Sequence, residues 1–154
     1  MIGKTWIFDP EKHRWLPGPE LKHRRYNHGC FSVKDESQNI TEIYVTGGYC
    51  PGCGERLAST EVLRINGSEE NWHWSDVQDL PHGIMNFNAA IGSREGVYLG
   101  YNVGGNGVNG IEDTIYGLRK TSQGLQWDEV RKINSPSYYH SVVNAPSSYI
   151  VPFC

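Results

Sequence analysis

The chain has 154 residues, which is enough to bury the core of one ordinary domain. Hydrophobic residues make up 38% of it, and its 18 glycines and 12% aromatics are typical of short strands joined by turns. A formal charge of -3 lacks the basic excess that phosphate binding requires, so we expect no nucleic-acid partner. No apolar run reaches the roughly 18 residues of a membrane span, so we expect no membrane contact.

The compartment stays open at this stage. The first residues, Met-Ile-Gly-Lys-Thr-Trp, lack an apolar segment long enough for a signal peptide, which favours a cytoplasmic location for the chain as written. Two triplets, at residues 39–41 and 66–68, match the acceptor pattern for N-glycosylation. They would suit a secreted protein if the natural chain extends further at its N-terminus.

Three apolar segments that begin with threonine each lead to a tryptophan. They are residues 5–10 before Trp15, residues 60–65 before Trp74, and residues 114–118 before Trp127. The tryptophans are 59 residues (74 − 15) and then 53 residues (127 − 74) apart. Both separations are close to the roughly 50-residue period of a four-stranded propeller blade, so the chain is interpreted as copies of one unit.

Pairs of short strands occupy the other half of each unit. They are residues 25–31 before 42–48, residues 85–91 before 96–99, and residues 138–143 before 148–151. In the clearest copy, Tyr44 and its β-branched neighbours favour a half-buried strand, and Gly47 and Gly48 then allow a tight turn. No stretch has sustained apolar residues at helical spacing, so we predict an antiparallel all-β architecture with almost no helix.

In residues 23–81 the order is Arg-Tyr-x-His, an aromatic strand closed by Gly-Gly, Thr-x-β-x-β, then Trp and Leu-Pro. This order resembles the kelch repeat, one blade of a β-propeller in the galactose oxidase and kelch-like superfamily. The resemblance covers about residues 4–151 and implies four-stranded antiparallel blades. It makes Gly47, Gly48, Trp15, Trp74 and Trp127 structural repeat positions.

The register of the repeat implies an incomplete ring. An outer half-blade at 4–16 precedes whole blades at 23–81 and 83–133, and an inner half-blade follows at 137–152, giving two full blades plus two half-blades. Propellers usually have four to eight blades. Three explanations remain: the chain is a fragment of a longer propeller, it is an arc with exposed edges, or two copies pair edge to edge as a six-blade homodimer.

The copies match imperfectly at several positions. After Tyr98 and Leu99 the expected Gly-Gly is replaced by Tyr-Asn, with Gly104 and Gly105 displaced by three residues, and Pro-Phe stands there in the last copy. The tryptophans and the series Tyr44, Tyr98 and Tyr149 are expected to pack between blades. His28, Asn88 and His140 are assigned to one repeat position with a structural role.

The pair Cys50 and Cys53 is the sharpest local motif. It is compatible with a disulfide that staples a loop, with two free thiols, with half of a zinc site completed by Cys30 or His28, or with a redox pair. No Gly-x-Ser-x-Gly or phosphate-loop signature is present, because the glycines at 104–110 lack the Gly-Lys-Ser/Thr ending. We therefore expect no catalytic residues, no metal site and no cofactor.

The loops after the second strand of each blade, and those between blades, should emerge on one face. They carry the candidate partner-binding residues Arg24, Arg25, Tyr49, Asn106, Asn109 and Tyr138. Because Arg and Tyr are common at interface hot spots, the sequence favours a non-catalytic module that binds a protein or peptide. The alternatives are an enzyme or metal-dependent specifier protein on a kelch scaffold, and a secreted structural repeat protein.

Overall fold

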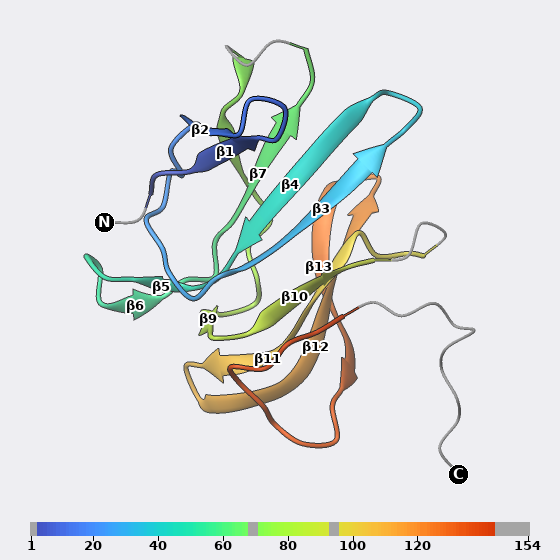
Figure 1. Ribbon diagram of the computed structural model, residues 1–154. Helices are drawn as coiled ribbons and strands as arrows, with labels where there is room; N and C mark the ends of the chain where they lie inside the picture. Colours follow the sequence, from blue (N-terminus) through green and yellow to red (C-terminus); the bar gives the residue numbers. More distant parts are fainter. Residues whose placement is uncertain (1–2, 68–70, 93–95, 144–154) are drawn as a thin grey trace.

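The computed structural model describes residues 3–67, 71–92 and 96–143, and its regular secondary structure there is made of β-strands. Every strand pairing is antiparallel (Figure 1). The prediction of an antiparallel all-β chain is therefore confirmed, and one of the two larger sheets has the predicted four strands.

Two larger sheets form the body of the protein. The first sheet has the order β3 (Gly29–Asp35), β4 (Ile40–Thr46), β7 (Thr60–Ile65) and β8 (Trp74–Val77). The second sheet has the order β10 (Asn88–Ile91), β11 (Gly100–Gly107), β12 (Gly110–Thr121) and β13 (Gly124–Lys132), with β9 (Ile84–Met85) paired to β11. The strands β3, β4, β7 and β8, and likewise β10 to β13, are neighbours in chain order, so both sets are meanders; the short β9 is the exception.

Two hairpins flank this body (Figure 1). The N-terminal hairpin pairs β1 (Trp6–Asp9) with β2 (Arg14–Pro17). A shorter hairpin, between β4 and β7, pairs β5 (Tyr49–Cys50) with β6 (Glu55–Arg56). We call the shorter one the disulfide hairpin, because Cys50 and Cys53 are bonded across it.

Alternation of side chains along β4 and β7 gives the first sheet two apolar faces. Tyr44 and Val62 are buried in one cluster with Leu118 and Trp127 of the second sheet. On the opposite face Leu63 belongs to a second cluster, on the side of the N-terminal hairpin. Side chains on both faces of one sheet thus hold three layers together: hairpin, first sheet and second sheet.

A double glycine follows β4 directly, and another interrupts β11 where its pairing with β12 shifts register, between Val103 and Gly105. The φ angles are 61° and 96° at Gly47 and Gly48, and 58° and 115° at Gly104 and Gly105, a region that side chains rarely adopt. A Cβ on Gly47 would also lie 2.6 Å from the carbonyl oxygen of Ile84. Gly104 and Gly105 are therefore the counterparts of Gly47 and Gly48.

This match corrects the predicted register of the second unit. The strand expected at residues 96–99 is absent, and β11 begins at Gly100 instead. Tyr101, three residues before Gly104, takes the place of Tyr44, so Tyr98 is not the counterpart of Tyr44 and the glycines are not displaced. Tyr149 and the end of the predicted inner half-blade, residues 144–152, lie outside the described residues.

A tryptophan hydrogen bond repeats between successive layers. The indole Nε1 of Trp74 donates to the carbonyl oxygen of Pro19 at 3.0 Å, and that of Trp127 to the carbonyl oxygen of Gln78 at 3.1 Å. Each acceptor lies four residues after the preceding tryptophan (19 − 15 and 78 − 74). We call this pattern the indole relay. Trp74 and Trp127 are buried, whereas Trp15 is 63% exposed, so the predicted packing role does not extend to Trp15 within this chain.

A second repeat runs through the backbone. The amide of Asn86 donates to the carbonyl of Asn27 at 3.0 Å, and the amide of Tyr139 donates to the carbonyl of Asn86 at 2.9 Å. All three residues are left-handed, with φ of 53°, 56° and 54°. Their spacings, 59 (86 − 27) and 53 (139 − 86), equal those of the tryptophans. We call this pattern the backbone relay.

The backbone relay also shows which residues are equivalent in the repeat, because each equivalent residue directly follows a left-handed one. His28 and His140 are such residues, and the one between them is Phe87. The sequence-based assignment of Asn88 to this position is therefore wrong by one residue. The Phe87 ring packs against Gly47 of the preceding unit, as His140 packs against Gly104, so this position fills the space that each first glycine leaves open.

We expect the indole relay to contribute measurably to stability. Trp127→Phe removes the indole donor to the Gln78 carbonyl and to the buried Thr60 hydroxyl, and should lower the free energy of unfolding by about 1–2 kcal/mol. Trp72→Phe is the matched control, since no described group accepts a hydrogen bond from the buried Trp72 Nε1. Urea denaturation should show a near-neutral effect there, and equal losses for both variants would contradict the relay.

Glu42 connects the two sheets through charge. Its carboxylate accepts hydrogen bonds from Tyr44 Oη at 2.8 Å and Arg64 Nε at 2.9 Å, and lies 3.3 Å from Lys120 Nζ of the second sheet. Burial opposes its ionisation, but the hydrogen bonds from Tyr44 and Arg64 and the charge of Lys120 outweigh burial and lower the pKa of Glu42. The ionised form is therefore the one that the fold stabilises.

This lowered pKa predicts a stability difference that depends on pH. Glu42→Gln should be less stable than the natural chain by about 1–3 kcal/mol at pH 7, where the carboxylate is charged in both states. The difference should shrink as pH falls below the ordinary value of 4.5 and vanish below the lowered pKa of the folded state. Urea denaturation of both proteins from pH 7 to pH 3 measures it, and a constant difference would contradict the assignment.

Candidate functional site

The connections that follow each double glycine and those between the layers lie along one edge of the molecule. This loop edge comprises residues 22–27, 49–56, 82–86, 106–113 and 137–140. The disulfide hairpin, β9 and the turn between β11 and β12 lie on the same side, at the left of Figure 1. The turns at residues 36–39 and 122–123 lie at the opposite ends of their strands. The two edges of the sheets are therefore distinct surfaces.

The disulfide hairpin is anchored at its base. Tyr49 pairs with Arg56 across the hairpin, and it also exchanges two backbone hydrogen bonds with Tyr26, of 2.9 and 3.1 Å. The rings of Tyr26 and Tyr49 are 5.4 Å apart. The Cys50–Cys53 disulfide closes the tip, which answers the question that the sequence left open about these thiols. The hairpin therefore projects from a fixed base, as a recognition loop on a scaffold requires.

Arg25 lies beneath this edge and not on it. It is fully buried, and its guanidinium donates to Glu61 Oε1 at 2.6 Å, to the Gly47 carbonyl at 2.7 Å and to the Ser59 carbonyl at 2.8 Å. Glu61 is fully buried as well, and it also accepts from the backbone amides of Lys22 and His23. The prediction that Arg25 contacts a partner is therefore corrected: it holds the connection between layers against β7.

Arg24 points the other way. It is exposed and lines a groove of about 290 Å³ between residues 22–24 and the tip of the disulfide hairpin, with Pro51 and Gly52 on the far wall. The alternation follows from the extended backbone, in which neighbouring side chains face opposite directions. Of the two adjacent arginines, only Arg24 is exposed at the surface.

The other predicted residues occupy the remainder of the loop edge. Asn106 Oδ1 accepts a hydrogen bond from Arg56 Nη2 at 3.1 Å, which links β11 to the base of the disulfide hairpin. Asn109 is exposed in the turn between β11 and β12. Tyr138 is 44% exposed, and its ring lies 5.2 Å from that of Tyr139. The structure thus joins Tyr49 to Asn106 through Arg56, while Asn109 and Tyr138 lie further along the edge.

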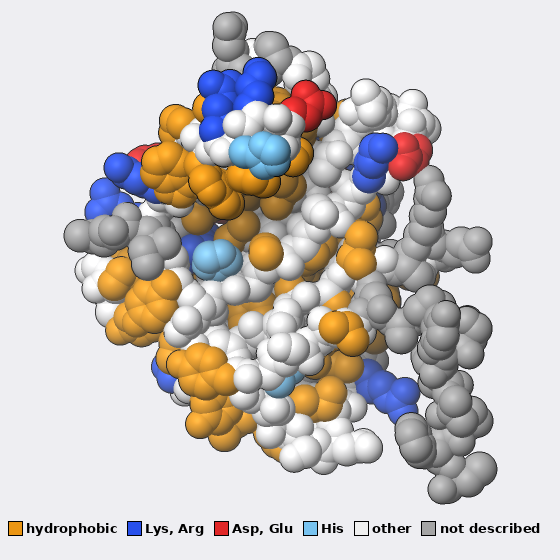
Figure 2. Space-filling model, in the orientation of Figure 1, with side chains coloured by type: hydrophobic (Ala, Val, Ile, Leu, Met, Phe, Trp, Pro, Cys, Tyr) orange, Lys and Arg blue, Asp and Glu red, His pale blue; other side chains and the backbone are white. Residues whose placement is uncertain are grey.

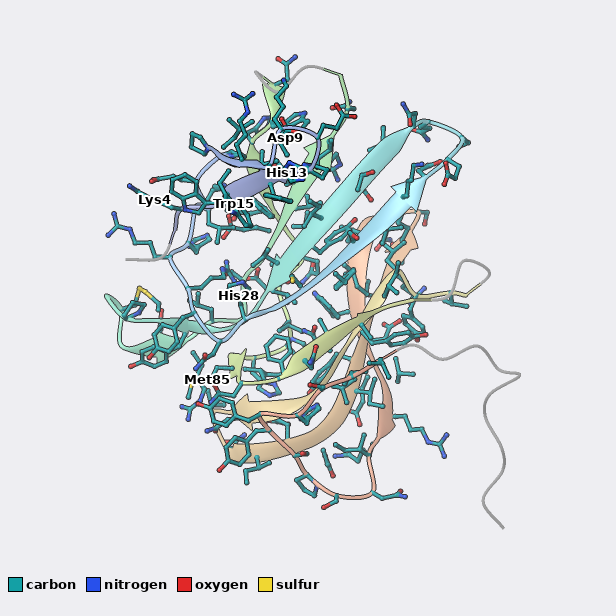
Figure 3. All side chains as sticks on the ribbon, in the orientation of Figure 1. Lys4, Asp9, His13, Trp15, His28 and Met85 are labelled. Atoms are coloured by element: carbon teal, nitrogen blue, oxygen red, sulfur yellow. A yellow bond between two sulfur atoms is a disulfide. The ribbon has the colours of Figure 1, made fainter. Side chains whose placement is uncertain are left out.

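Sequence reasoning missed several residues of this surface. Arg56 was not singled out, although it bridges two segments that are 50 residues apart in the chain. His82 lies 2.9 Å from Glu112 and forms an edge-on contact with Tyr116. No local signal marks these contacts. Met85, labelled in Figure 3, pairs with Asn106 across β9 and β11, and no local signal marks that pairing either.

The chemistry available at the loop edge is hydrogen bonding and aromatic contact. Among the described residues, no three His, Cys, Asp or Glu side chains come together in a group that could hold a metal ion. The thiols of Cys50 and Cys53 are bonded to each other, so in this state neither is a metal ligand. Cys30 is a free, exposed cysteine on β3, away from the disulfide hairpin.

Compared with known protein families and with curated protein sequences, the chain matches none. None of the described residues belongs to a helix with the length and apolarity needed to cross a membrane. The internal repeat and the loop edge therefore carry the functional argument.

The buried pair of Arg25 and Glu61 should dominate the stability of this edge. Arg25→Leu leaves the Glu61 carboxylate buried without its countercharge, and we expect the free energy of unfolding to fall by about 3–5 kcal/mol. Arg14→Leu is the control, because Arg14 and Asp9 form a solvent-exposed pair whose loss should cost less than about 1 kcal/mol. Chemical denaturation separates the two, and similar losses would overturn this role of Arg25.

Proposed function

We propose that this chain is a set of kelch-type propeller blades and acts as a non-catalytic module that binds a protein or peptide along its loop edge. The equal spacing of the indole relay and the backbone relay supports the view that the chain is made of repeated units. The meandering order of strands β3, β4, β7 and β8, with the left-handed glycines Gly47 and Gly48 directly after β4, agrees with the kelch resemblance of residues 23–81.

One observation carries the functional part of the proposal. Separate connections converge on a single edge and are held there by contacts from below: the Arg25 and Glu61 pair, the Tyr26 and Tyr49 bridge, and the Arg56 to Asn106 hydrogen bond. Rigid support reduces the ordering cost of binding. A surface that only had to be soluble would not require this rigid support of its loops.

The shape and composition of the edge favour a macromolecular ligand. The groove beside Arg24 is lined by the side chains of residues 22–24 and by the tip of the disulfide hairpin, and the rest of the loop edge adds the exposed Asn109 and Tyr138. Tyrosine and arginine contribute strongly at protein interfaces. An extended peptide or a protein loop would contact several of these groups together, whereas a small molecule would reach only a few.

The test begins with a random peptide library selected on the whole, folded chain. Backbone amide shifts should then map the selected peptides to the loop edge. Tyr138→Ser with Asn109→Ala should weaken binding at least about tenfold, because both side chains are on the exposed part of the edge. Gln38→Ser with Gln123→Ser, in turns at the opposite edge, is the matched control. Shifts confined to that opposite edge, or equal binding by both double variants, would refute the proposal.

A further inference from the structure

The two sulfurs of the disulfide hairpin have unequal surroundings. Cys53 is exposed at the tip, whereas Cys50, at the end of β5, is only 7% exposed. The sulfur of Cys50 also accepts a hydrogen bond from the backbone amide of Cys53, at 3.1 Å. Figure 2 shows the hairpin at the left of the view, with its side chains on the surface of the molecule. A thiol from solution therefore reaches Cys53 more easily than Cys50.

Basic side chains lie beside this disulfide. Lys22 and Arg24 line the same groove of about 290 Å³ as Cys50 and Cys53, and the described residues that line it include neither Asp nor Glu. When a thiolate attacks a disulfide, negative charge develops on the sulfur that departs. Positive side chains and an N–H donor both stabilise such a sulfur. The groove therefore favours opening of the disulfide with Cys50 as the departing sulfur.

The base of the hairpin is held without the disulfide. The amide of Leu57 donates to the carbonyl of Gly48 at 2.8 Å, and Tyr49 exchanges two backbone hydrogen bonds with Tyr26. The disulfide closes only residues 50–53, and a cross-link across so short a loop adds the least stability. Opening it should therefore loosen the tip and leave both sheets intact.

We propose that the disulfide is a site of reversible modification by small thiols such as glutathione, and that Cys53 is the sulfur they attack. A glutathione thiolate bonds to the Cys53 sulfur, the Cys50–Cys53 bond breaks, and Cys50 leaves as a thiolate and takes up a proton. A second glutathione thiolate then attacks the glutathione sulfur of this mixed disulfide. Glutathione disulfide is released, and Cys53 takes up the second proton. Two glutathione molecules are thus oxidised, and the protein disulfide is reduced to two thiols.

The exposure of Cys53 separates this disulfide from a purely structural one. Structural disulfides resist reduction by glutathione, whereas exposed ones are the labile and regulatory ones. The tip also forms the far wall of the groove beside Arg24, so its opening changes the shape of that groove. The inference concerns the disulfide itself and does not rest on peptide binding at the loop edge.

The first experiment compares the two sulfurs in the whole chain with its other cysteines replaced, Cys30→Ser and Cys154→Ser. In this background Cys50→Ser leaves only the Cys53 thiol, and Cys53→Ser leaves only the Cys50 thiol. Circular dichroism checks that both variants keep their strand content, and mass spectrometry follows the addition of glutathione from glutathione disulfide. We expect Cys53 to react at least about tenfold faster, because it is exposed and Cys50 is buried. Equal rates, or a faster reaction at Cys50, would overturn the proposal.

The second experiment examines what reduction changes in the natural chain. An excess of reduced glutathione in an oxygen-free buffer should open the disulfide. Hydrogen exchange should then accelerate at least about tenfold at the amide of Gly54, which donates to the Cys50 carbonyl within the tip. The amides of Tyr49 and Leu57 should stay protected, because their acceptors belong to the base. A disulfide that glutathione leaves closed, or loss of protection at the base as well, would contradict the proposal.

A charge variant tests the contribution of the groove. Arg24→Gln should slow the opening by glutathione about threefold at low salt, and the difference should shrink at high salt because exposed charges are screened. Arg14→Gln is the matched control, since Arg14 is an exposed arginine of the N-terminal hairpin and does not line the groove. Equal rates for the two variants at low salt would rule out this role of Arg24.

Discussion

All five N–H donors of the Arg25 guanidinium form hydrogen bonds inside the protein. They reach the carbonyls of His23, Gly47 and Ser59, the Ser59 hydroxyl and the Glu61 carboxylate. Through these bonds one side chain holds the connection between layers, the double-glycine turn and the start of β7 in a single arrangement. A buried charge is tolerated only when its partners are complete, so any displacement of these segments would leave a charge unpaired. The placement of the disulfide hairpin and of Arg24 follows from this constraint.

Strand alternation and turn residues were sufficient to predict the sheets, since both act locally. The same rules failed at residues 96–99, where Val97, Tyr98 and Leu99 favour a strand by propensity. The strand forms instead in the glycine-rich segment that follows, because β12 offers it a long pairing partner. Tertiary pairing outweighs strand propensity, which is weak and depends on context.

The repeat position of Asn88 was misjudged for a different reason. His28, Asn88 and His140 have polar side chains that look alike, whereas Asn27, Asn86 and Tyr139 share a left-handed backbone and a main-chain hydrogen bond. A backbone property of this kind leaves little trace in side-chain identity. Arg25 shows the same limit: a basic run is usually exposed, and nothing nearby in the sequence indicates a carboxylate 36 residues away. The loop edge could be predicted as a region, but which of its residues face outward could not.

The two spacings of the repeat differ by six residues (59 − 53), and yet both relays are formed across both spacings. Part of the difference lies between the double glycine and the next threonine, where the first unit carries the disulfide hairpin. Additions at this point leave the layer contacts in register, because those contacts depend on residues before and after the loop. The architecture therefore separates what evolution can vary from what it must keep. Loop length and tip chemistry can diversify toward new ligands, while tryptophan donors and left-handed residues preserve the packing.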